Sequence, residues 1–163
     1  MTWIDVASVA LFVVVGVVEA KRGFLPAAVD LCLMLLGLNL CKQLTGAVAS
    51  SLGSRAMAFG LLLLLCVIVA AVASSLIDRH TKWEIGPFDS AAGGIVGVVV
   101  GLAVAHGVYH AVALSGAGGH ALVARSLLAP EIYELRAMHS IGDALRSLGG
   151  GPRITDRVKK SQE

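Results

Sequence analysis

The sequence contains little charge for a chain of its length. Only 15% of its 163 residues are charged and 56% are hydrophobic, whereas an average soluble domain carries about 25% charged residues. A soluble domain of this size needs a polar surface, and residues 1–115 hold too few polar side chains to make one. The composition therefore disfavours a soluble fold and indicates an exterior that faces lipid.

Cysteine is scarce as well. Cys32, Cys41 and Cys66 all lie inside apolar runs, and their odd number argues against a disulfide framework. The net charge is only +2, and the Lys and Arg residues form no patch interleaved with aromatic residues. These features give no support to a nucleic-acid partner.

Catalytic and metal-binding signatures are also missing. The sequence has no HExxH helix, no GxSxG elbow and no phosphate-binding loop. Ser115 and His120 are close in sequence but lack an orienting acid. His106 and His110 share a helix face, yet a zinc site needs three or four ligands. We therefore expect a protein that is not an enzyme and that carries no cofactor and no metal.

Long apolar runs are what the sequence does contain. About 20 apolar residues cross the roughly 30 Å hydrocarbon core of a bilayer, and four runs approach or exceed that length. They are continuous, as in helices, and do not alternate as barrel strands do. The first run follows an acidic start and is expected to be retained, unlike a signal peptide. The runs are Trp3–Val18, Phe24–Leu44, Met57–Ile77 and Pro87–Leu114.

The predicted fold class is therefore all-α: a polytopic membrane protein with four transmembrane helices and a C-terminal amphipathic helix. Residues 1–115 form the four-span bundle, with a Gly- and Ser-rich link expected at Thr45–Ala56. Residues 116–148 form a linker and the amphipathic helix, in which apolar residues recur at helical spacing from Ile132 to Leu148. Residues 149–163 form a charged tail that is expected to be disordered.

Small residues are spaced four apart in two of the spans. The glycine stripe of the fourth span consists of Gly93, Gly97, Gly101 and Ala105, and such a stripe favours close helix packing. The third span offers a matching set as the expected partner. This set is Cys66, Ala70 and Ser74. Contact within the chain and contact between protomers both remain open.

Some polar residues lie well inside the apolar spans. An ionisable residue inside a membrane is a candidate functional residue, and Asp30, Asn39 and His106 are the candidates here. Asp30 is within reach of Arg22, so a structural ion pair and a proton or ion site are alternative interpretations of this carboxylate.

The motifs together resemble the colicin V production protein family over about residues 3–148. The resemblance implies a bacterial inner-membrane protein that is needed for production or export of a peptide toxin, and it brings no catalytic residues. It rests on Trp3-Ile4-Asp5, on Arg22-Gly23-Phe24, on Asp89 followed by the glycine stripe, and on Ser126-Leu127-Leu128-Ala129-Pro130.

Two positions depart from the family pattern. Ala27 stands where the family usually has an acid, and Asp30, one turn later, is the candidate replacement. Ser90 stands where the family favours Arg. We expect Arg22 and Asp89 to lie on one face of the membrane. An ion pair between them would join the link between the first two spans to the start of the fourth span.

Two functions follow as alternatives. The first is a non-enzymatic accessory or scaffold for colicin V-type bacteriocin production in the bacterial inner membrane. The second is a small transporter or channel that acts as an oligomer, with a polar path lined by Asp30, Asn39 and His106. The expected partners are the lipid bilayer and either a second copy of the chain or another membrane protein.

Overall fold

Six helices make up the structure, a computed structural model that describes residues 2–80 and 88–133. No strand occurs within these residues, which confirms the all-α prediction. The helices are α1 (Trp3–Arg22), α2 (Phe24–Leu52), α3 (Arg55–His80), α4 (Asp89–Ala113), α5 (Ala117–Ala124) and α6 (Ala129–Ile132).

The helices α1 to α4 are each long and apolar enough to cross a membrane. Large apolar side chains cover the outside of the bundle: Val13 and Val14 on α1, Leu36 on α2 and Leu64 on α3 each remain more than half exposed. Water solvates such an apolar surface poorly, whereas lipid chains solvate it well. The protein is therefore a multi-pass membrane protein.

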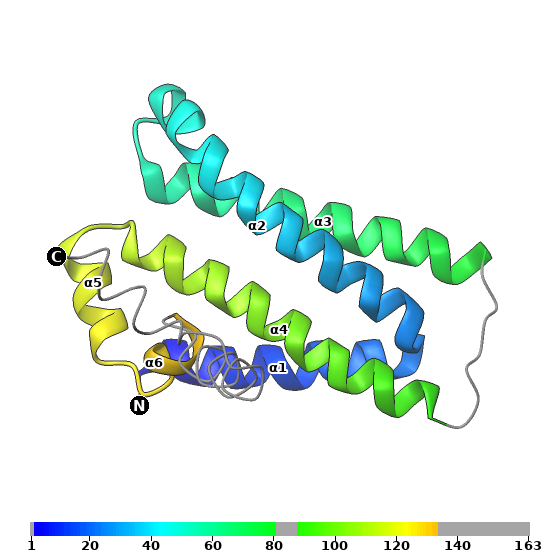
Figure 1. Ribbon diagram of the computed structural model, residues 1–163. Helices are drawn as coiled ribbons and strands as arrows, with labels where there is room; N and C mark the ends of the chain where they lie inside the picture. The colour runs from blue at the N-terminus through cyan, green and yellow to red at the C-terminus, as the bar shows by residue number, and fades with distance from the viewer. Residues whose placement is uncertain (1, 81–87, 134–163) are drawn as a thin grey trace, which may run out of the picture.

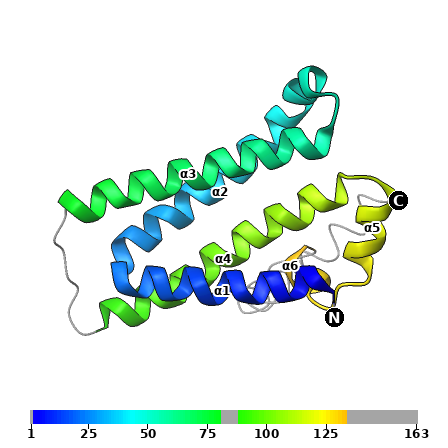
Figure 2. The same cartoon turned by 180° about the vertical axis from the view of Figure 1, so that it is seen from behind.

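The bundle is built from two pairs of long helices. Helix α1 lies along α4, α2 lies along α3, and α2 also packs against α4, as the two opposite views show (Figures 1 and 2). Met34, Leu38, Phe59, Leu63 and Val100 form the core where α2, α3 and α4 meet. The contact between α2 and α4 thus joins the two pairs into one body.

The second helix is longer than the sequence indicated. The link expected at Thr45–Ala56 is mostly helical, and α2 ends at Leu52. Hydroxyl groups in this stretch bond within the helix: Thr45 Oγ1 donates to the Cys41 carbonyl, and Ser50 Oγ donates to that of Ala47. The turn comes at Gly53, whose φ of 69° gives the left-handed conformation that glycine favours at a helix end.

The glycine stripe packs on α1, and the expectation that it packs on Cys66, Ala70 and Ser74 of α3 was wrong. A methyl group at Gly93 would lie 2.7 Å from the Glu19 carbonyl oxygen, and one at Gly97 would lie 3.1 Å from Gly16 Cα. Helix α1 can approach so closely because it presents its own glycine, Gly16, at this crossing.

The small residues of α3 pack against α2 and in the core. A methyl group at Gly37 of α2 would lie 2.9 Å from Cys66 Sγ, and the sulfur atoms of Cys41 and Cys66 are 3.5 Å apart. Ala70 and Ser74 are both buried. Helices α2 and α3 form an antiparallel hairpin, and α2 packs on this face of α3.

Two short helices close one end of the bundle. Helices α5 and α6 lie beside the start of α1 and the end of α4 (Figure 1). The linker predicted to begin at residue 116 starts with a turn at Gly116, with a φ of 102°, and is then partly helical, because α5 begins at Ala117. Beyond α6, the predicted amphipathic helix and charged tail lie outside the described residues.

Candidate functional site

A buried carboxylate holds together the end of the bundle where α1 begins. Asp5 is completely buried and accepts hydrogen bonds from three parts of the chain. Its Oδ2 lies 2.6 Å from the Thr2 amide nitrogen and 3.0 Å from Thr2 Oγ1. Tyr109 Oη of α4 lies 3.3 Å from Asp5 Oδ1, and Ser126 Oγ donates to the same oxygen. We call Thr2, Asp5, Tyr109 and Ser126 the Asp5 cluster.

The Asp5 cluster also fixes the segment that leads into α6. The amide groups of Leu127 and Leu128 donate to Asp5 over 3.4 and 3.2 Å. Ser126 Oγ accepts a hydrogen bond from the Ala129 amide at 3.1 Å, and Ala129 begins α6, which has proline in its first turn. Sequence reasoning left the roles of Tyr109 and Ser126 unassigned, although the Ser-x-x-Ala-Pro pattern is itself a helix-start signal.

The two histidines of α4 pack against the same end. His106 Nδ1 lies 2.9 Å from the Ile132 carbonyl oxygen of α6. The ring of Tyr133 stacks on both histidines, with centroids 6.1 Å away. Phe59 meets His110 edge-on at 4.9 Å. These contacts give His106 and His110 a place in helix packing, between α3, α4 and the segment after α5.

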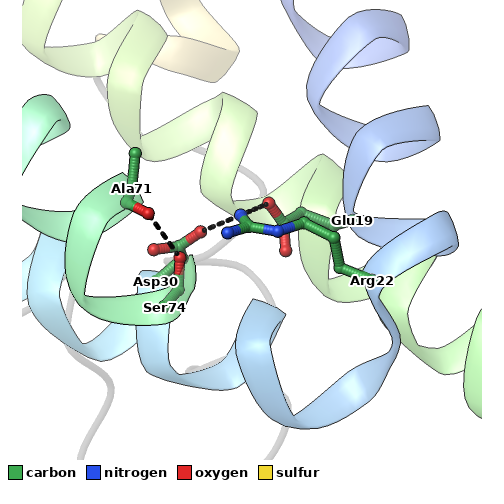
Figure 3. A network of polar contacts seen from close by, with 5 residues as sticks. All are labelled: Glu19, Arg22, Asp30, Ala71 and Ser74. Atoms are coloured by element: carbon green, nitrogen blue, oxygen red, sulfur yellow. Dashed lines mark hydrogen bonds and ion pairs between the residues drawn. The ribbon is translucent and has the colours of Figure 1, made fainter. Parts of the chain in front are cut away.

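A second polar cluster lies at the opposite end of the bundle, where α1 passes into α2. Arg22 Nη1 lies 3.1 Å from Glu19 Oε1 and 3.3 Å from Asp30 Oδ2. Ser74 of α3 lies beside the Asp30 carboxyl group (Figure 3). We call Glu19, Arg22, Asp30 and Ser74 the Arg22 cluster. One guanidinium group is shared by two carboxylates and joins α1 to α2, and Ser74 of α3 lies next to this pair.

The Arg22 cluster faces a cavity. Glu19, Arg22 and Asp30 line one part of a space of about 180 Å³. The remaining walls are apolar and come from all four long helices. They are Val14, Val15, Val18, Met34, Val67, Ala70, Ala71, Val100 and Val104. An apolar cavity with charged groups in its wall is the usual form of a small-ligand site, so the Arg22 cluster is the candidate functional site.

The expected ion pair between Arg22 and Asp89 does not form. Arg22 is engaged by the nearer Glu19 and Asp30, while Asp89 Oδ1 accepts a hydrogen bond from the Phe24 amide at 3.2 Å. Asp89 therefore does connect the first link to the start of α4, but through the backbone. The amide of Phe24 is free to donate because the first amide groups of a helix have no partner within it.

The polar residues proposed for a membrane path do not come together. Asp30 is in the Arg22 cluster, whereas His106 is at the end of the bundle that α6 covers. Asn39 is exposed on α2, where Gln43 Nε2 donates to its side chain over 3.4 Å. The three residues thus face three different environments.

A comparison with known protein families matches residues 4–137 to the colicin V production protein family. The chain belongs to the colicin V production protein family. Searches of the curated proteins and of the solved structures found no match.

The motifs that suggested the colicin V production family lie at the two ends of this bundle. Asp5 and the segment Ser126–Pro130 meet in the Asp5 cluster. At the other end, Arg22 contributes to the Arg22 cluster, and Gly23 and Phe24 meet Asp89. Motif residues far apart in sequence are thereby in contact in the folded chain.

Proposed function

We propose that this protein is a non-enzymatic accessory or scaffold of the bacterial inner membrane that supports production or export of a colicin V-type toxin. The match to the colicin V production family over residues 4–137 is the observation that carries the proposal. The four membrane-spanning helices are consistent with a role beside an export system in the same membrane.

The placement of the polar groups supports a structural role. The Asp5 cluster and the Arg22 cluster both tie helices to one another. The hydroxyl of Ser115, which is near His120 in sequence, donates to the Val112 carbonyl oxygen over 2.7 Å and so bonds within its own helix end. The exposed apolar side chains of α1, α2 and α3 offer surface to lipid, to a second copy or to another membrane protein.

The experiment is a complementation test in a toxin-producing bacterium that lacks its own member of the family. Expression of this chain should restore toxin in the medium while the toxin gene stays equally transcribed. An Asp5→Ala variant should fail to restore it, because the Asp5 cluster holds the fold together. An Asp78→Asn variant, altered at an exposed position of α3, is the matched control. Unchanged toxin output with and without the chain would overturn the proposal.

The cavity beside the Arg22 cluster favours one second candidate, a small transporter or channel. A charged wall in a cavity between membrane helices is a feature of transport proteins. Ion flux from the purified protein in liposomes, abolished by Asp30→Asn, would favour transport. Absence of flux together with intact toxin output would favour the accessory role.

A further inference from the structure

Two carboxylate oxygens in the Arg22 cluster have no hydrogen-bond partner among the described residues. They are Glu19 Oε2 and Asp30 Oδ1. Glu19 is 3% exposed and Asp30 is 5% exposed, and both side chains line the cavity. A buried carboxylate oxygen without a hydrogen-bond donor is costly, because it has lost its hydrating water and has gained no donor or positive charge from the protein in exchange.

The charge of the cluster is also unbalanced. Arg22 contributes one positive charge, and its Nη1 contacts both carboxylates. From α4, only Val100 and Val104 face this space, and Asp89 is occupied by the Phe24 amide. With Glu19 and Asp30 both ionised, the cluster carries one uncompensated negative charge between apolar helices, which is strongly unfavourable at low dielectric. One more positive charge would restore the balance.

The hydrogen bonding of Ser74 indicates which oxygen would carry the additional positive charge. Ser74 Oγ is fully buried and donates its only hydrogen to the Ala71 carbonyl oxygen over 3.3 Å. In this orientation the hydroxyl hydrogen is directed to Ala71, although Figure 3 places the Ser74 and Asp30 side chains next to each other. The hydroxyl oxygen can still accept a hydrogen bond. Asp30 Oδ1 would gain a partner if it carried a hydrogen itself.

A metal ion suits this site poorly. Only two carboxylates are present, and the described residues contain no group of three or more His, Cys, Asp or Glu side chains placed to hold a metal. The guanidinium group of Arg22 would also repel a cation bound to the same carboxylates. A proton needs one oxygen and one acceptor, both of which the cluster supplies.

We propose that the Arg22 cluster is a proton-binding site, in which Asp30 Oδ1 carries one exchangeable proton and turns toward Ser74 Oγ as its nearest acceptor when it is protonated. On binding, one O–H bond of a hydronium ion breaks and one O–H bond forms at Asp30, which leaves a water molecule; on release, the proton passes back to water. Glu19 and Arg22 remain an ion pair throughout. The cavity and the partly exposed Arg22 side chain give the proton its route to the aqueous phase. The site does not depend on the proposed role in toxin production.

Infrared difference spectroscopy tests this site directly. The full chain in lipid nanodiscs is compared between acidic and alkaline buffer, in water and in deuterium oxide. We expect a carbonyl band from a protonated carboxyl group that disappears at alkaline pH and shifts in deuterium oxide. Asp30→Asn should abolish the band. Glu19→Gln should abolish it too, because Asp30 would then be left ionised with Arg22 to itself.

Two further variants separate a proton site from a general structural defect. Ser74→Ala should keep the band but shift its frequency, because the hydrogen-bond acceptor is lost. Asp78→Asn should leave the band unchanged. Helix content from circular dichroism confirms that each variant is folded. A wild-type protein without the band, a band that survives in Asp30→Asn or in Glu19→Gln, or a band displaced by sodium or potassium ions would overturn the proposal.

Discussion

The buried carboxylates at the two ends of the bundle differ in how completely they are hydrogen-bonded. At one end, both oxygens of Asp5 accept hydrogen bonds from Thr2, Tyr109 and the segment that follows α5. At the other end, Glu19 and Asp30 share one guanidinium group, and each keeps an oxygen that no described residue hydrogen-bonds. A satisfied buried charge stabilises the fold, whereas an unsatisfied one is retained where it serves another purpose.

The largest loss of stability is expected at the end of the bundle that contains the Asp5 cluster. Asp5→Ala removes the common acceptor and leaves several buried donors without a partner. We expect it to lower the free energy of unfolding by about 3 kcal/mol, since hydrogen bonds to a charged group contribute more than neutral ones. Thermal unfolding in nanodiscs measures this, with the exposed Asp78→Ala as the control. A loss no larger than that of Asp78→Ala would show that the Asp5 cluster does not hold this end.

At the end of the bundle that contains the Arg22 cluster, close packing of the α1 and α4 backbones is expected to stabilise the fold. In Gly93→Ala the added methyl group would lie 2.7 Å from the Glu19 carbonyl oxygen and from the Gly23 carbonyl carbon. Main-chain atoms cannot give way easily, so we expect a loss of about 2 kcal/mol from overpacking. Gly60→Ala on α3 is the matched control, because nothing lies within 4 Å of its new methyl group. Equal stability of the two variants would contradict the close packing of α1 on α4.

A smaller loss is expected where Asp89 binds the Phe24 amide. Asp89→Ala should reduce the free energy of unfolding by about 1 kcal/mol, because one hydrogen bond between α4 and the start of α2 is lost. Asp89→Asn keeps an acceptor oxygen and should retain most of the stability. If both variants lose the same amount, the charge of Asp89 matters more than the bond to the backbone.

The smallest effect is expected from Glu19→Gln. In this variant Asp30 can ionise and pair with Arg22 in place of Glu19, so the free energy of unfolding should change by less than about 1 kcal/mol, because the buried ion pair is partly offset by its desolvation. Asp5→Asn is the matched comparison, since it removes the same charge from the satisfied end and should be clearly more destabilising. Equal losses for the two variants would remove the distinction between the two ends.

The sequence predicted the membrane helices well because apolar length is a local property. The four runs became four helices, and the main error was at Thr45–Ala56, where α2 continues to Leu52. Serine and threonine there suggested a loop. Their hydroxyl groups instead bond to carbonyl oxygens of the same helix, as they can in any helical segment.

The candidate site was only partly predictable. Asp30 stood out because a carboxylate inside an apolar run is rare, and its reach to Arg22 could be judged from helix geometry. Glu19 follows the first apolar run and comes shortly before Lys21 and Arg22, so the sequence suggested a charged connection there, and Ser74 was predicted to be a packing residue. Neither residue could be assigned to the cluster without knowing that the end of α1, the start of α2 and α3 converge there.

The sequence by itself determined that this chain spans a membrane as four helices, because the cost of placing polar groups in lipid acts on each segment independently. The tertiary structure decided which small residues meet and which charges share a partner. The glycine stripe meets α1 because Gly16 lies at that crossing, and Arg22 pairs with Glu19 and Asp30 because α1 and α2 meet there. Such pairings depend on how helices cross, and residue spacing along a single helix leaves that open.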